Sequence, residues 1–265
     1  MKVFYPFLLF MVIFPVLAQN QKKEDSFLKK QEEIIAVHHT NCALQYNYRF
    51  QMNEWQTCLD KGLEKDSTIA YLWQQKAMPY FKAKKYEVGM EYLDKAVFYD
   101  KKRWLPYRAF IKCIFSKSYV AAIADFEAAK EIFGNSYEMD HSYDFYIGLS
   151  YLQLNKFAKA EQIFANDIKE QIERRGEAHY LDLFYYGIAL YEQQKWQEAI
   201  IQFDKALDFY NQFSDAKYYK YVCLFNLGAY TQSENILMEA QQDAKNGFTI
   251  NEDNAVYETY PYQIK

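Results

Sequence analysis

The sequence predicts an all-α fold, a right-handed superhelical solenoid of antiparallel helix pairs with about six units. Three observations predict it. An aromatic residue recurs at intervals of 31 to 39 residues, and small and large residues follow it at constant offsets. Glycine and proline, which interrupt helices, number only 8 and 5 among 265 residues. Repeats of this length are typical of helix pairs that bury their apolar faces by stacking on adjacent copies.

The recurring aromatic residue, which we call the anchor, marks the second helix of each pair. The anchors are Trp55, Tyr86, Tyr119, Phe157, Trp196 and Tyr230. Three residues after each anchor the residue is small, as at Ala160 and Ala199, and seven after it most units carry a large one, as at Phe164 and Phe203. Offsets of three, seven and ten lie on one face of a helix, so these residues form one packing stripe. Small residues let a neighbouring helix approach, and large ones fill the space beside it.

An apolar segment precedes each anchor and predicts the first helix of the pair. In four units a small residue stands nine or ten positions before the anchor, namely Ala77, Ala109, Gly148 and Gly187. The first and last units carry Tyr46 and Tyr221 there. Such deviations are typical of terminal repeats, which cover the ends of the stack.

This pattern resembles the tetratricopeptide repeat family, with the best matches at residues 70–103, 141–174 and 180–213. In the first of these, Trp73, Ala77, Tyr80, Gly89, Leu93 and Ala96 stand at the family positions. The closing proline of the family is missing, with Lys101 in its place, so helix ends are less sharply defined. The resemblance implies a fold that binds protein or peptide partners on the concave surface formed by the first helices.

Residues 1–18 are predicted to be a secretory signal peptide. Lys2 precedes an apolar run that ends in small residues at Ala18, as is typical before a cleavage site. A membrane anchor is the alternative, but the run contains Pro6 and Pro15 and barely reaches the length that spans a bilayer. No cysteine directly follows the cut, which disfavours a lipid anchor. We therefore expect an exported protein, periplasmic or secreted, whose mature chain has no membrane span.

The rest of the chain divides into three predicted parts. Residues 19–38 form a helical extension, residues 39–247 form the repeat domain, and residues 248–265 form an extended tail rich in tyrosine. The tail either packs on the last helix pair or receives a partner. Extra length falls around residues 134–144 and 168–180, and we expect surface loops at both places.

Four cysteines raise the question of disulfides in an exported chain. Cys42 and Cys58 would lie on neighbouring antiparallel helices, and the sequence leaves open whether they pair. Cys113 and Cys223 are far apart along the chain, and we expect them to be buried thiols.

The sequence disfavours nucleic-acid binding and catalysis. The net charge is −4, and the charged residues of both signs are interspersed, without the basic patch that binds phosphates. The chain contains no glycine-rich phosphate loop, no paired-cysteine zinc motif and no nucleophile elbow. We therefore predict that the protein is not an enzyme and uses no cofactor.

Candidate metal ligands are few, and the sequence predicts no metal site. His38 or His39 with Cys42 would place two ligands on one helical face, but two ligands do not make a site. His141 and His179 stand beside the extra segments, and we expect surface or packing roles for them. The acidic residues of the tail lack the glycine turn of a calcium loop.

The predicted binding surface lies on the first helices, at positions twelve, eight and five before the anchors. The candidate partner-binding residues are Met78, Phe81, Phe145, Leu149, Leu152, Phe184, Ile188, Tyr191, Tyr218 and Phe225. Family members that clamp chaperone tails carry Lys and Asn at such positions, and this chain does not. The alternative is that these side chains pack helices against each other or hold the chain's own tail.

The most consistent function is an interaction scaffold that accepts an apolar or aromatic segment of another protein on this surface. A small-ligand or glycan-binding envelope protein is one alternative, since tyrosine and tryptophan are abundant. A component of outer-envelope assembly is the other. The sequence indicates neither the partner nor the oligomeric state.

Overall fold

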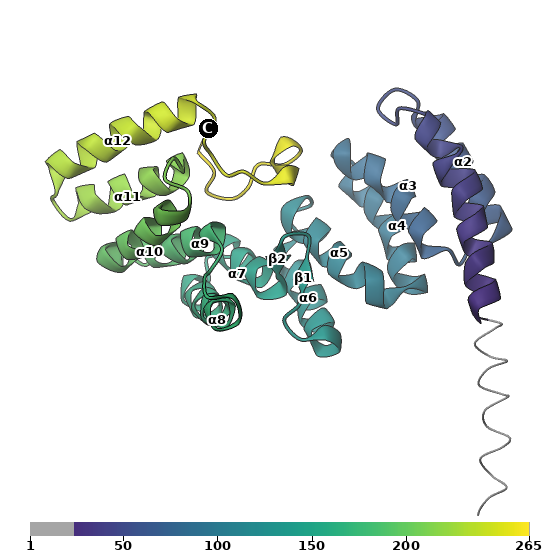
Figure 1. Cartoon of the computed structure of the whole chain (residues 1–265), viewed down its shortest axis with the longest axis horizontal. Helices are drawn as coiled ribbons and strands as arrows, with labels where there is room; N and C mark the ends of the chain where they lie inside the picture. Colours follow the sequence, from purple (N-terminus) through teal and green to yellow (C-terminus); the bar gives the residue numbers. More distant parts are fainter. Residues whose placement is uncertain (1–23, 265) are drawn as a thin grey trace, which may run out of the picture. The chain divides into compact units, whose positions relative to one another are not determined.

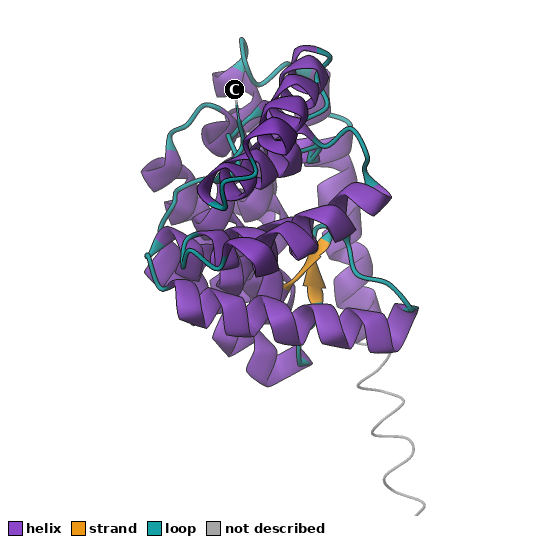
Figure 2. Cartoon of the chain, turned by 90° about the vertical axis from the view of Figure 1, so that its left-hand side faces the viewer, coloured by secondary structure: helices purple, strands orange, loops and turns teal. Residues whose placement is uncertain are grey.

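The computed structural model describes residues 24–264, so the predicted signal peptide at residues 1–18 lies outside the described part. The described chain is mostly helical (Figure 2) and divides into two compact units between Lys101 and Lys102. No helix within residues 24–264 has the length and apolar character needed to cross a membrane.

The first unit begins with a helix over residues 24–35. It then contains η1 (Ala36–Thr40, a π-helix), η2 (Ala43–Gln45, a 3-10 helix), α2 (Met52–Lys65), α3 (Ala70–Lys82) and α4 (Tyr86–Tyr99). A cluster of buried residues around Trp55, Leu59 and Leu72 joins α2 to the elements on either side of it. Cys42 and Cys58 form a disulfide, which ties the start of η2 to α2. The pairing that the sequence left open is therefore made.

The second unit consists of four helix pairs in chain order (Figure 1). They are α5 (Lys101–Ile114) with α6 (Tyr119–Phe133), α7 (Tyr143–Gln153) with α8 (Phe157–Arg175), α9 (Tyr180–Tyr191) with α10 (Trp196–Phe209), and α11 (Ser214–Asn226) with α12 (Tyr230–Lys245). Arg108 and Lys112 of α5 both form ion pairs with Asp125 of α6. Each of the later pairs packs on the next, as a stack of repeats requires.

Five of the six anchors are the first residue of a helix, whereas Trp55 is the fourth residue of α2. α4, α6, α8, α10 and α12 start at Tyr86, Tyr119, Phe157, Trp196 and Tyr230. The residue two positions before each of these anchors has a positive φ in every case, from 54° to 79°, at Lys84, Lys117, Asn155, Gln194 and Gly228. A single left-handed residue reverses the chain between the two helices of a pair, so one turn geometry recurs along the molecule.

The expected fit of small against large residues is confirmed. A Cβ atom added to Gly187 would lie 2.5 Å from the ring of Phe203, and one added to Gly148 would lie 2.8 Å from Phe164. Real Cβ atoms do not approach other atoms so closely. The glycines of the first helices therefore let the phenylalanines of the second helices pack directly on the backbone.

The two extra segments differ from each other. Residues 134–144 form a short hairpin in which β1 (Tyr137–Glu138) pairs antiparallel with β2 (His141–Ser142), drawn in orange in Figure 2. The prediction of a loop at 168–180 was wrong for most of its length, because α8 continues to Arg175. Ile168 and Gln171 keep a buried stripe on this extension, and Gly176, at φ +84°, ends it.

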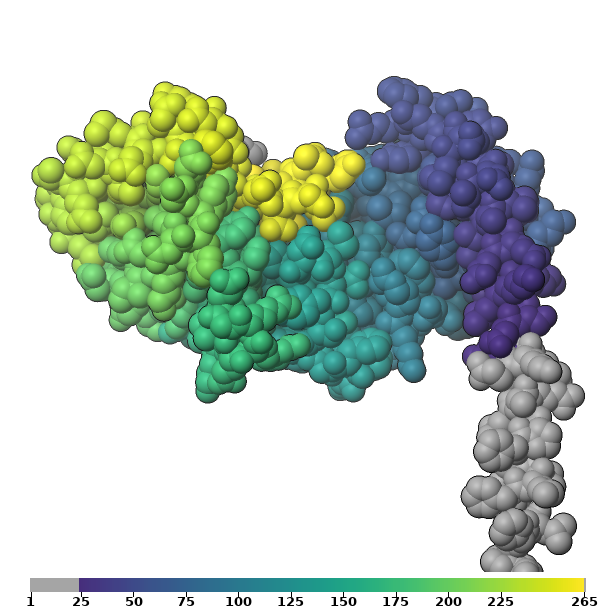
Figure 3. Space-filling view, in the orientation of Figure 1, coloured from purple at the N-terminus to yellow at the C-terminus, as the bar shows by residue number. Residues whose placement is uncertain are grey.

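Residues 248–264, which we call the tail, follow α12 and include the short helix η3 (Asp253–Val256). Both ends of the tail lie on the last helix pair, because the backbone N–H groups of Ile250 and Ile264 bond to Asp215 of α11. Between these points the tail runs back toward α9 and α7, as the yellow trace of Figure 1 and the yellow atoms of Figure 3 show. Its contacts with these helices define the candidate site.

Candidate functional site

Most of the predicted binding residues are core residues. Six of them are at most 1% exposed, namely Phe81, Phe145, Leu149, Leu152, Phe184 and Ile188. Phe145 packs against Phe164, with ring centroids 6.2 Å apart, and Phe184 packs against Phe203 at 6.0 Å. These six side chains are buried while the tail is in place, so they pack the helices in this structure, and their contact with a partner stays a prediction.

The other four predicted residues retain exposed surface. Met78 belongs to α3 in the first unit, while Tyr191, Tyr218 and Phe225 belong to α9 and α11 of the second. Phe225 is 52% exposed. The ring of Tyr191 packs against Trp196 and Tyr219. Tyr218 lines a pocket described below.

The residues that face the tail stand one position later in the repeat, eleven before the anchor. They are Tyr185 of α9 and Tyr219 of α11, while Tyr146 stands at the same position of α7 and donates its hydroxyl to the carbonyl of Glu138 (3.1 Å). Tyr185 Oη donates a hydrogen bond to the carbonyl of Pro261 (2.9 Å), and the ring of Tyr219 lies 5.8 Å from that of Tyr262. The sequence analysis missed these tyrosines, although their recurrence in three successive units was a readable signal.

Asp215, near the start of α11, holds the tail at two points. Its Oδ2 accepts from the backbone N–H of Ile250 (2.9 Å), and its Oδ1 accepts from that of Ile264 (2.6 Å). One carboxylate therefore closes the tail into a loop. Burial raises the pKa of Asp215 to about 6, although the two tail N–H groups favour its charged form.

The returning half of the tail is bound through its backbone carbonyls. Lys117 Nζ donates to the carbonyl of Thr259 (3.2 Å), and Tyr185 binds Pro261 as described. Both donors are side chains of the repeat fold and both acceptors are main-chain atoms. Such bonds do not depend on which side chains the bound segment carries.

Side chains of the tail add apolar and polar contacts. Ile250 and Tyr260 are 3% and 2% exposed, so both are buried on binding the helices. Tyr262 Oη donates to Glu192 Oε1 at the end of α9 (2.7 Å). Burial raises the pKa of Tyr262, and the neighbouring Glu192 carboxylate raises it further, so its hydroxyl stays protonated. We call Lys117, Tyr185, Glu192, Asp215 and Tyr219 the tail-binding face.

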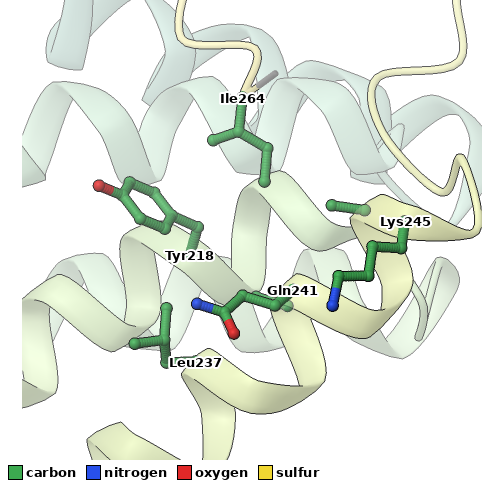
Figure 4. Close-up of a pocket in the computed structure, with 7 residues that line it drawn as sticks. Tyr218, Leu237, Gln241, Lys245 and Ile264 are labelled. Carbon is green, nitrogen blue, oxygen red and sulfur yellow. The ribbon is translucent and has the colours of Figure 1, made fainter.

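A pocket of about 590 Å³ opens beside the last described residue of the tail. It is lined by Tyr218, Leu237, Ala240, Gln241, Ala244, Lys245 and Ile264. Figure 4 shows Tyr218 of α11 and Ile264 of the tail on opposite sides of the space above Leu237 and Gln241 of α12. The pocket therefore continues the tail-binding face along the last helix pair, with an apolar floor and a lysine at its edge.

A second group of polar residues lies where the hairpin, α9 and the tail meet. His141 on β2 is buried, with Nδ1 3.6 Å from Asp182 Oδ2 and Nε2 3.3 Å from Glu252 Oε1 of the tail. His179, which directly precedes α9, has Nδ1 3.6 Å from the same Asp182 oxygen. Burial lowers the pKa of His141, but the facing carboxylates raise it overall to about 9.

Neighbouring side chains hold Asp182 in place. Gln171 Nε2 of α8 donates to Asp182 Oδ1 (2.8 Å) and to Asp167 Oδ2 (3.0 Å), and Ser142 Oγ also donates to Asp167 Oδ2 (2.8 Å). Burial raises the pKa of Asp167 to about 7, and the nearby Asp182 carboxylate adds to this shift. The extension of α8 therefore supports the cluster, which sequence spacing did not reveal.

The candidate ligands near residue 40 have other contacts. Cys42 is in the disulfide. His39 packs edge-on against Trp55 and Tyr71, and burial lowers its pKa. The structure therefore gives these residues a packing role.

The sequence matches no family model and no curated protein. Solved structures do match. A tetratricopeptide repeat protein from Parabacteroides merdae has a TM-score of 0.62 and 13% identity, over 81% of this chain and 80% of that one. PilW, described as a widely conserved type IV pilus biogenesis factor, has a TM-score of 0.60 and 14% identity, over 78% and 92%. YrrB, described as a TPR protein with an unusual peptide-binding site, has a TM-score of 0.51 and 17% identity, over 71% and 93%.

These likenesses show the fold. The chain is an all-α stack of helix pairs of the tetratricopeptide repeat type, as the anchor spacing predicted.

Proposed function

We propose that the protein is an exported interaction scaffold, not an enzyme, and that its second unit binds a tyrosine-bearing peptide segment of a partner protein. The binding surface is the tail-binding face, which the chain's own tail covers. The observation that carries this proposal is the tail itself, a peptide segment held by side chains of three of the four helix pairs of the second unit.

The chemistry of the face favours a peptide over a glycan or a small ligand. Lys117 and Tyr185 donate to main-chain carbonyls, and Asp215 accepts from main-chain N–H groups. Donors and acceptors spaced along several helices match the repeating polar groups of a polypeptide backbone. Glu192 and Tyr219 select a tyrosine, through its hydroxyl and its ring.

Two of the residues predicted from sequence belong to this surface in the proposal. Tyr191 supports Tyr219, and Tyr218 lines the pocket beside Ile264. An apolar side chain of a partner, placed one or two residues beyond the tyrosine, fits that pocket. Two proteins of the same fold, YrrB with its peptide-binding site and the pilus biogenesis factor PilW, agree with a binding role.

The disulfide between Cys42 and Cys58 and the apolar run within residues 1–18 support export. Disulfides persist in oxidising compartments and are rare in the cytosol. We expect the mature protein to start at Gln19 and to fractionate with periplasmic or secreted proteins. N-terminal sequencing of the native protein checks this, and an intact Met1 in the cytosolic fraction would contradict it.

To test peptide binding, the tail is cut from the folded protein, which uncovers the tail-binding face. A specific protease site is inserted between Gly247, which is exposed, and Phe248. The protein is cut, the tail is removed, and a labelled peptide of residues 248–264 is titrated by fluorescence anisotropy. We expect saturable rebinding, at least tenfold weaker for a peptide with Tyr260→Ala and Tyr262→Ala.

Circular dichroism shows whether the cut protein remains folded. A folded protein that does not rebind the peptide, or binds a scrambled peptide equally, contradicts the proposal. If cutting unfolds the second unit, the full-length variant Asp215→Asn is used in place of the cut protein. This variant loses one acceptor for the main chain of the tail, so binding of the tail to the helices is weakened while the chain stays whole. The tail-free protein is then used as bait in an envelope extract, with the uncut protein as the matched control.

A further inference from the structure

The cluster of His141, His179 and Asp182 has the composition of a metal centre. One ligand atom from each of the three residues lies within 4.8 Å of the other two. Two imidazoles and one carboxylate suit a first-row divalent cation such as Zn²⁺, whereas Mg²⁺ and Ca²⁺ prefer oxygen ligands only. Helix packing accounts for part of their contacts, since His141 stacks on Phe145 of α7 and Gln171 of α8 donates to Asp182.

The distances are close to those of a bound ion. Zn²⁺ holds nitrogen and oxygen ligands at about 2.0–2.2 Å, so tetrahedral ligand atoms stand roughly 3.3–3.6 Å apart. Asp182 Oδ2 is 3.6 Å from Nδ1 of both histidines. The third separation joins the ligand atoms of His141 and His179. Rotation of the His179 side chain, which is 41% exposed, shortens it. Its Nδ1 contact with the N–H of Leu181 is long, at 3.4 Å, and is easily exchanged.

Buried polar atoms in the cluster lack hydrogen-bond partners. Asp182 Oδ2 and His141 Nε2 are both buried without one. Their distances to charged neighbours, 3.6 Å and 3.3 Å, exceed the usual range for an N–H to oxygen bond. A buried carboxylate oxygen without a partner is costly, and a cation at coordination distance would remove that cost.

We propose that His141, His179 and Asp182 bind one first-row divalent cation of the Zn²⁺ class, and that Glu252 links this centre to the tail. His141 coordinates through Nδ1, which leaves its Nε2–H facing Glu252 Oε1 at 3.3 Å. A carboxylate behind a ligating histidine fixes the ring and strengthens its binding. Gln171, bonded to Asp182 Oδ1, keeps the other oxygen toward the ion. Water completes the coordination on the exposed side of His179.

The centre therefore acts on the tail. Glu252 pairs with His141 only when the tail lies on the helices, so binding of the ion favours the covered state. This inference does not depend on the identity, or even the existence, of a partner protein.

The first experiment measures the stoichiometry and affinity of binding. The full-length mature protein, stripped with a chelator and then dialysed, is titrated with Zn²⁺ by calorimetry. We expect one ion per chain, and at least about 100-fold weaker binding in His179→Ala, which removes a ligand at a partly exposed position. His38→Ala in the first unit is the matched control and keeps full affinity. Absence of binding, or equal loss in both variants, overturns the metal centre.

The second experiment tests the link to the tail and excludes the thiols. Co²⁺ bound at this site gives a spectrum without sulfur-to-metal charge transfer, whereas a band from Cys113 or Cys223 would overturn the assignment. Zn²⁺ slows hydrogen exchange of the backbone at residues 249–253 in the native sequence. Glu252→Gln weakens Zn²⁺ binding about 10- to 100-fold and abolishes this protection. Tight binding with unchanged exchange would refute the coupling to the tail.

Discussion

The two units of the molecule are closed in different ways. In the first, a disulfide between Cys42 and Cys58 ties the entry of the chain to α2. In the second, the tail returns from α12 and contacts residues as early as Lys117, which precedes α6, through noncovalent bonds alone. Both devices add long-range contacts to a fold whose other contacts run mainly between neighbouring helices.

The difference lies in exchangeability. A disulfide acts mainly by restricting the unfolded chain and stays in place while the fold persists. The tail acts by filling a surface, and in the function proposed above another segment with the same polar groups replaces it. On that proposal the first unit is held permanently, whereas the second has a surface that the tail covers until a competing segment binds.

The largest expected effect comes from Tyr260→Ala, which removes the most buried aromatic side chain of the tail. Loss of a buried ring costs about 3 to 5 kcal/mol in the free energy of unfolding. Urea unfolding followed by signals of the second unit measures it. Val256→Ala, at an 80% exposed position of the same segment, is the control and changes little. Equal effects would mean that the tail does not stabilise the second unit.

The next effect is loss of the disulfide. Cys42 and Cys58 are 16 residues apart, and the loss of a cross-link of that length destabilises a protein by about 3 kcal/mol. We expect Cys42→Ser with Cys58→Ser to lower the stability of the first unit only. Reducing agent should have the same effect on the native chain and none on the double variant. A matching drop in the second unit would show that the two units unfold together.

The packing rule common to both units is tested by Gly89→Ala and Gly187→Ala. In each case the added Cβ would lie 2.5 Å from a phenylalanine ring, Phe81 in the first unit and Phe203 in the second. Overpacking costs about 1 to 3 kcal/mol, and we expect similar values at both sites. Phe203→Leu should restore part of the loss in Gly187→Ala. If Phe203→Leu restores no stability, the cost arises in the helix backbone and not from contact with the phenylalanine ring.

The smallest effect is a pH dependence that belongs to the second unit. The pKa of Asp215 is raised to about 6, above roughly 3.9 in the unfolded chain, so between these values the folded state holds more protons. The contribution of Asp215 to stability is therefore greatest below about pH 4 and falls as pH rises to about 6. We expect a loss of about 1 to 2 kcal/mol over this range. Urea unfolding of the native protein and of Asp215→Asn at pH 4 to 7 gives the stability difference that is due to Asp215. A stability difference that grows with pH would contradict the prediction.

The repeat architecture was predictable because its signals are local. An anchor at Trp196 or Tyr230 marks a helix start, and the small and large residues around it lie on one face. The rotation of each helix about its own axis was not predictable to within one residue. A shift of one position turns a side chain by about 100° around the helix, and Phe184 points into the core while Tyr185 meets the tail.

The candidate site was only partly predictable because it joins distant parts of the chain. Asp215 contacts Ile250 and Ile264, and His141 meets Glu252, through the path of the tail, which has no periodicity to read. The extension of α8 was taken for a loop, although Ile168 and Gln171 continue its buried stripe. Long-range convergence of this kind depends on tertiary packing.

The left-handed residue before each anchor has a consequence for how the chain tolerates change in length. Lys84, Lys117, Asn155 and Gln194 adopt nearly the same backbone angle at equivalent places. A segment cut from one such reversal to the next has matching ends, so a module can be duplicated, removed or grafted without remaking the joint. Variation in the number of modules is then a natural route by which chains of this design lengthen or shorten.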